Sequence, residues 1–89
     1  MRLEIGYSYF SPTRIWPSPA QHELILENRD MEISDILIIN SLGIMCHKYP
    51  SIRNMQFNMD VSGLAEGFYI IQIRLISGLS EVHKIMIQR

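Results

Sequence analysis

The segment from Asp60 to Leu75 constrains the fold more than any other part of this chain. It reads DVSGLAEGFYIIQIRL, so a polar strand end passes through a turn with two glycines into a long alternating run. The alternate apolar residues of that run share one face: Tyr69, Ile71, Ile73 and Leu75. This pattern is typical of a strand that follows a chain reversal in an antiparallel sheet and buries one face. The segment therefore predicts an antiparallel β protein.

Similar period-two patterns recur along the chain, separated by turn residues about every eight to twelve positions. We expect further strands over residues 22–28, 33–40, 44–48, 55–61 and 82–88. A helix over 31–42 is the main alternative, and the crowded isoleucines there disfavour it because β-branched side chains lose rotamer freedom in a helix. About seven short strands can close a core only by stacking one sheet on another. We therefore predict an all-β fold, a small immunoglobulin-like antiparallel β-sandwich.

Length and charge narrow the function classes. The 89 residues, of which 47% are apolar, can form one small domain, with 1–14 as a lead-in or linker remnant and 15–89 as the sandwich. A net charge of −1, with scattered charged residues, gives no electrostatic footprint for nucleic acid or an anionic membrane. Glu4 and Ser8 interrupt the apolar stretch that a signal peptide would need, so no signal peptide is visible.

Residues that could carry catalysis are few. Cys46 and His47 are neighbours on a predicted strand and should point to opposite faces, so we expect a small buried Cys46 and a surface His47. His22, His47 and His83 fall on three different strands without metal-ligand spacing. We therefore expect no catalytic residue, no metal site and no cofactor.

The turn after residue 59 contains polar side chains, which we interpret as stabilising the turn itself. Asp60 should accept hydrogen bonds from the backbone of the following turn, and the Ser62 hydroxyl should stabilise the same turn. A calcium site at Asp60 and Glu66 is conceivable, although two carboxylates are few for that cation. A carbohydrate platform could also form from aromatic side chains, but we expect core packing instead: Trp16, Phe57, Phe68 and Tyr69.

Several sequence pieces, in order, resemble a known family. These are WPSPA, HELILE, DILIINSLG, FNMDVSGLAEGFYIIQI and HKIMIQR, which together run from about Ile15 to Arg89. The order is similar to that of the type A C-terminal sorting domain of the type IX secretion system, found at the end of proteins exported by certain Gram-negative bacteria. The residues that match its turn and motif positions are Pro17, Pro19, Asn40, Gly43, Asp60, Ser62, Leu64, Gly67 and Tyr69. Two positions differ from the family pattern, since Ser18 replaces Asn and Ile44 replaces Gln.

The resemblance implies a non-enzymatic address label at the C-terminal side of a cargo protein. Its partners would be the outer-membrane secretion machinery and a sortase-like peptidase that cleaves upstream of Trp16, and the parent protein would be secreted or held at the cell surface. Recognition would rest on shape and exposed strand edges, and the best candidate for the contact is the terminal strand: Lys84, Ile85, Met86, Ile87, Gln88 and Arg89.

Two other classes remain open at the level of sequence. The chain could be a stand-alone secreted immunoglobulin-like binding module, or a structural spacer of a larger surface protein. A small sandwich also has exposed edge strands, which can pair between copies to give an edge-strand homodimer.

Overall fold

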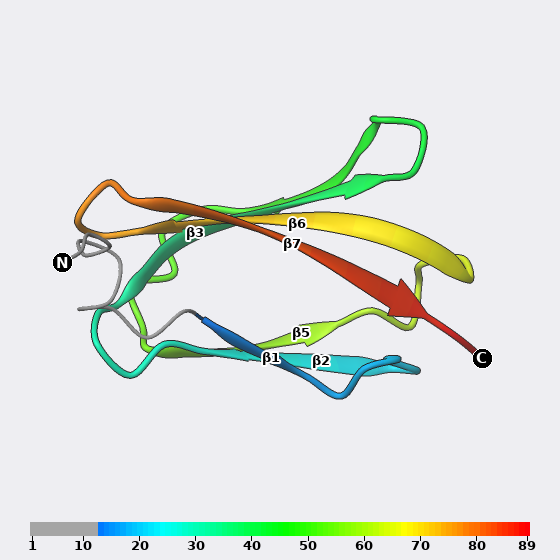
Figure 1. Ribbon diagram of the computed structural model, residues 1–89, viewed down its shortest axis with the longest axis horizontal. Helices are drawn as coiled ribbons and strands as arrows, with labels where there is room; N and C mark the ends of the chain where they lie inside the picture. The colour runs from blue at the N-terminus through cyan, green and yellow to red at the C-terminus, as the bar shows by residue number, and fades with distance from the viewer. Residues whose placement is uncertain (1–12) are drawn as a thin grey trace, which may run out of the picture.

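Residues 13–89, which the computed structural model of the protein describes, form two antiparallel sheets stacked face to face (Figure 1). The three-stranded sheet has the order β1 (Arg14–Trp16), β2 (Glu23–Glu27) and β5 (Gln56–Asp60). The four-stranded sheet has the order β4 (Met45–Tyr49), β3 (Ile33–Asn40), β6 (Gly67–Leu75) and β7 (Ser80–Ile87). The predicted all-β sandwich is confirmed. Within 13–89, no helix is long and apolar enough to span a membrane.

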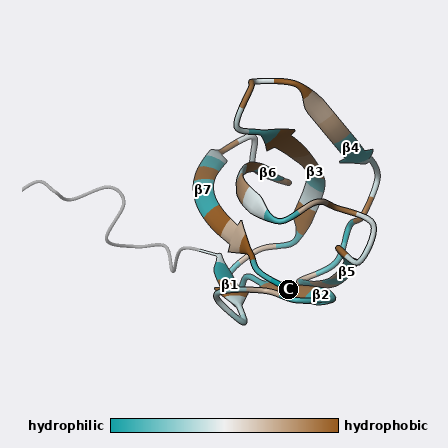
Figure 2. Ribbon diagram, turned by 90° about the vertical axis from the view of Figure 1, so that its right-hand side faces the viewer, coloured by the Kyte–Doolittle hydropathy of each residue, from teal (hydrophilic) through white to brown (hydrophobic). Residues whose placement is uncertain are grey.

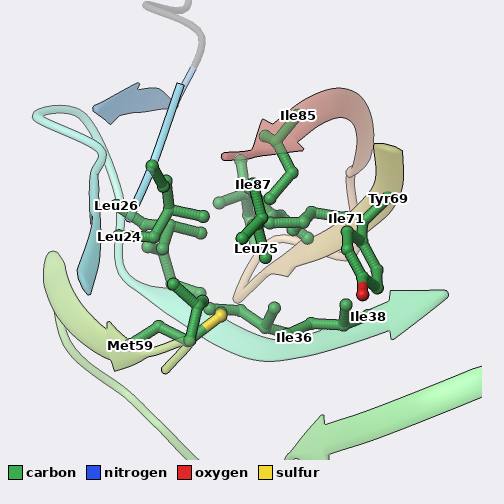
Figure 3. Packing of buried hydrophobic residues seen from close by; sticks show 14 residues of the cluster. Leu24, Leu26, Ile36, Ile38, Met59, Tyr69, Ile71, Leu75, Ile85 and Ile87 are labelled. Carbon is green, nitrogen blue, oxygen red and sulfur yellow. The ribbon is translucent and has the colours of Figure 1, made fainter. Parts of the chain in front are cut away.

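The core lies between the sheets and is built from the predicted alternating positions. Leu24 and Leu26 of β2 face Ile36 and Ile38 of β3, with Met59 beside them (Figure 3). The rest of the core comes mainly from β6 and β7: Tyr69, Ile71, Ile73, Leu75, Ile85 and Ile87. Each fully buried aliphatic side chain contributes roughly 1.5–3 kcal/mol through removal of apolar surface from water. This packing stabilises the domain and fixes which side chains remain outside.

Residues 33–40 form β3, as predicted, so the helical alternative over 31–42 is wrong. The short strand β1, which begins at Arg14, was not predicted because three residues are too few to show alternation. Residues 1–12 of the expected lead-in lie outside the described part of the chain.

Strand β4 corrects the prediction for Cys46. This side chain is exposed rather than buried. β4 pairs with β3 alone and lies at the edge of the four-stranded sheet, away from the three-stranded sheet (Figure 2). A register shift between Ile38 and Ile39 also leaves Cys46 without a partner residue in β3. The Cys46 side chain lines an open groove between β4 and the β5–β6 turn rather than the core, so alternation alone could not bury it.

Candidate recognition surface

The terminal segment proposed for recognition divides into buried and outward side chains. Ile85 and Ile87 are buried in the core, because they alternate inward along β7. Lys84 is exposed and its ammonium lies 4.5 Å from the centre of the Phe68 ring, while Met86 is half-buried. Gln88 follows the strand and is exposed. In the folded domain, a partner can therefore reach Lys84, Met86 and Gln88 but not the two isoleucines.

Arg89 fixes the end of β7 to the opposite sheet. Its guanidinium donates hydrogen bonds to the carbonyl oxygens of Val61 at 3.0 Å and Ser62 at 2.9 Å, and also to those of Gln21 and Leu64. Its backbone N–H donates to the Glu66 carboxylate at 2.8 Å. We call this set of contacts the Arg89 clamp. Sequence patterns do not predict the clamp, because the residues that accept these bonds are distant from Arg89 in the chain.

The outer edge of β7 is partly occupied. Ala20 donates its backbone N–H to the Met86 carbonyl and accepts from the Gln88 N–H, both at 2.9 Å. Within residues 13–89, no strand pairs with the outer edge of β7 further toward its start. A strand that pairs with this edge would therefore find backbone N–H and C=O groups without a strand partner at Val82 and Lys84, rather than at Met86 and Gln88.

The Pro-Ser-Pro motif lies close to this chain end. Pro17 and Pro19 line the same surface hollow, of about 510 Å³, as His22, Gln88 and Arg89. The Pro-Ser-Pro motif therefore lies beside Gln88 and Arg89, although these residues are far apart in sequence.

The β5–β6 turn has the polar contacts that its sequence predicts. Asp60 Oδ1 accepts from the Ser62 backbone N–H at 2.9 Å and from the Ser62 hydroxyl at 2.6 Å. Both hydrogen bonds lower the pKa of the Asp60 carboxyl, and the bond from the Ser62 hydroxyl has the larger effect. The charge of His22 lowers this pKa further. Leu64 packs partly buried against the core, and Gly67 has a φ of +145°.

Tyr69 completes this turn. Its hydroxyl donates to the Ala65 carbonyl at 2.6 Å while its ring is buried in the core. The phenol thus satisfies its polar atom at the rim and ties β6 to the loop that precedes it.

The β3–β4 turn is organised by Asn40. Its side-chain oxygen accepts the backbone N–H groups of Leu42 at 2.9 Å and Ile44 at 3.0 Å. Gly43 has a φ of +82°, which other residues rarely adopt. The two motif residues shape the hairpin that carries β4.

Cys46 and His47 line a groove of about 420 Å³ between β4 and the β5–β6 turn, together with Tyr49 and Asp60. No hydrogen bond between Cys46 and His47 is found among residues 13–89. The His47 and Tyr49 rings lie 4.4 Å apart. Burial and, second, the Asp60 carboxylate raise the pKa of the Tyr49 phenol. The Ser62 hydroxyl also lines this groove, and its hydrogen bond to the Asp60 carboxylate is part of the β5–β6 turn.

The other candidate residues lie apart. His83 Nε2 lies 2.7 Å from Glu81 Oε1, and Glu66 is bound by Arg89 rather than aligned with Asp60. Within 13–89, no three His, Cys, Asp or Glu side chains are grouped as a metal site would require. Phe68 and Tyr69 are on opposite faces of β6, so the four aromatic residues do not form one platform. Core packing is confirmed for Tyr69 and, in part, for Phe57, but it is wrong for Trp16 and Phe68, which are exposed.

Comparison with known families connects these motifs to a function. The family model of the secretion system C-terminal sorting domain matches residues 14–88, which include all seven strands. The chain belongs to this family. The sorting domain is a signal for type IX secretion, which implies attachment to a parent protein and interaction with the type IX machinery.

Comparison with solved structures supports the fold alone. The chain resembles CopC from Methylosinus trichosporium OB3b with a TM-score of 0.51 and 14% identity, over 84% of this chain and 90% of CopC. No curated protein matches the chain significantly. The likeness to CopC concerns the β-sandwich.

Proposed function

We propose that the sorting domain is a non-enzymatic label that directs an upstream cargo across the outer membrane to the cell surface, and that the machinery reads it through Lys84 to Arg89. The family match over residues 14–88 carries the proposal. The position of the tail supports it, since Lys84 and Gln88 are exposed at the end of a strand whose edge is partly open. A sortase-like peptidase would then cut the linker upstream of Trp16.

A reporter fusion tests the proposed function. Residues 13–89, which include β1 and the Thr13 N–H bonded to the Glu81 carboxylate, are joined to a reporter with its own signal peptide. We expect the reporter in the medium or on the surface of a bacterium with a type IX system, and in the periplasm of a strain that lacks the system. Periplasmic retention in both strains would reject the sorting function.

A test of recognition through the tail needs a variant that loses exposed tail side chains but still folds. Deletion of residues 84–89 should abolish export, but it also removes the buried Ile85 and Ile87. A second variant changes only outward side chains, Lys84→Ser with Gln88→Ser. We expect export of this variant to fall at least severalfold while its melting temperature stays close to that of the parent. Export equal to that of the parent would reject recognition through the tail.

A further inference from the structure

The outer face of the four-stranded sheet is unusually apolar. Antiparallel sheets that turn one face to water usually place polar residues there. The strand register instead places apolar side chains from all four strands on this face, with one amide, Gln72, among them: Leu37, Ile39, Met45, Phe68, Ile70, Val82 and Met86. We call these seven apolar residues the outer apolar face. Val82 is 64% exposed, Met45 57% and Phe68 47%, whereas the other four are half-buried.

Basic residues surround the outer apolar face. Register places Lys48 beside Leu37 and Lys84 beside Ile70, at the two edges of the sheet. The Arg74 side chain lies on the same face, and its Nε is 3.7 Å from Asp35 Oδ1. The two charges of this ion pair cancel. Among residues 13–89, neither Lys48 nor Lys84 forms an ion pair with a carboxylate, so the face carries two positive charges, although the chain as a whole has a net charge of −1.

The outer side of the three-stranded sheet shows the opposite character. Its strands contain three carboxylates, Glu23, Glu27 and Asp60, with amides, one arginine, Arg14, and two apolar side chains, Trp16 and Ile25. Charge alone would favour stacking of this acidic side on the outer apolar face of a second copy. Each of these carboxylates already has a partner in its own chain, however: Glu27 with Arg29, Glu23 with Asn58, and Asp60 with Ser62. A stack would bury these polar groups without giving them new partners. The chemistry of both surfaces disfavours a second copy as the occupant.

We propose that the domain docks on the secretion machinery through the outer apolar face, an inference that rests on the sorting function proposed above. The partner is a protein surface of that machinery with apolar side chains and a rim of carboxylates. Contiguous exposed apolar patches mark interaction sites. Complementary rim charges steer the encounter and select the partner. The outward tail residues Lys84 and Met86 lie on this face, so the tail is one margin of a broader surface.

Matched double variants test the apolar contribution. Val82→Ser with Met45→Ser removes the two most exposed apolar side chains of the face. The control, Ile76→Ser with Leu79→Ser, removes side chains 57% and 44% exposed in the β6–β7 turn, away from the face. We expect export of the reporter fusion to fall about tenfold in the first pair and to stay within about twofold in the control, since interface cores hold most of the binding energy. Equal export of both pairs would overturn the inference.

Charge reversal tests the chemistry of the partner. Lys48→Glu with Lys84→Glu should lower export about tenfold, whereas Lys48→Arg with Lys84→Arg should retain it, because a carboxylate rim attracts either cation and repels glutamate. If the variant with Lys48→Glu and Lys84→Glu is exported as well as the parent, the proposal that the partner has a rim of carboxylates is wrong. The melting temperature of each purified variant is measured, so that a loss of export with an intact fold is attributed to docking.

Crosslinking identifies the occupant. A benzophenone amino acid replaces Val82 in the exported fusion and, as the control, Ile76. A crosslink from position 82 to a type IX outer-membrane component, at a peptide with apolar and acidic residues, supports the inference. A crosslink to a second copy of the domain, or to residues 1–12 of the same chain, overturns it. Failure of the parent fusion to be exported rejects the sorting function itself, whereas export of the parent with unaffected face variants rejects only this docking surface.

Discussion

At the residue scale, Gly67 shows how one backbone angle limits the choice of side chain. Its φ of +145° is unfavourable for residues with a Cβ, yet a Cβ there would meet no atom within 4 Å. The cost of substitution is therefore conformational rather than steric. We predict that Gly67→Val lowers the free energy of unfolding by about 1–3 kcal/mol in urea denaturation. Gly63→Val is the control, because Gly63 lacks a positive φ and is equally unobstructed; equal effects at both positions would contradict the backbone explanation.

Asp60 provides a pH-dependent contribution at the same scale. Hydrogen bonds from Ser62 lower the pKa of its carboxyl in the folded domain. Stability from this group is therefore fully present above the ordinary aspartate pKa of about 4 and is lost as the pH falls through the lower folded value. We predict that acidification from pH 6 to pH 2.5 destabilises the parent domain more than Asp60→Asn. Parallel stability curves for the two proteins would contradict this assignment.

At the element scale, the strands differ in how firmly the fold holds them. β6 lies between β3 and β7 and has alternate side chains buried, whereas β4 has one neighbour and four of its five residues exposed. Local opening should therefore cost less at β4. We predict that hydrogen exchange of the His47 amide, which pairs with Ile38 of β3, is at least tenfold faster than that of the Ile71 amide, which pairs with His83 of β7. Equal protection of the two strands would show that β4 opens only with the whole domain.

The same elements show how far the sequence predicts this structure. Alternation located β2, β3, β5, β6 and β7, because their inward side chains face another layer. It was wrong at Cys46, since burial at β4 depends on what lies opposite the strand and not on the strand itself. Turn chemistry predicted the Asp60 contact, which is local. The Arg89 clamp and the outer apolar face depend on the order of strands in the sheets, which the period of two does not specify.

At the scale of the whole molecule, the Arg89 clamp closes the end of the sandwich. One guanidinium joins the end of the chain to carbonyl oxygens of Gln21, Val61, Ser62 and Leu64, so it links both sheets and the loop between β5 and β6. Without it, four carbonyl groups lose a charged donor and return to water, which replaces part of the interaction. The contribution of the clamp therefore belongs to the closure of the domain and not to a single element.

We predict that Arg89→Ala lowers the free energy of unfolding of the domain by about 1–2 kcal/mol, a value reduced from that of buried charged hydrogen bonds because the clamp is largely exposed. Arg29→Ala is the control, since Arg29 has only a 3.7 Å ion pair with Glu27 at the surface. Chemical denaturation of both variants measures the difference. If the clamp also positions the tail for the secretion machinery, reporter export should fall further in Arg89→Ala than in Gly67→Val variants matched to it in stability. Equal export at equal stability would limit Arg89 to a role in folding, and would leave Lys84 and Met86 as the tail residues that the machinery contacts.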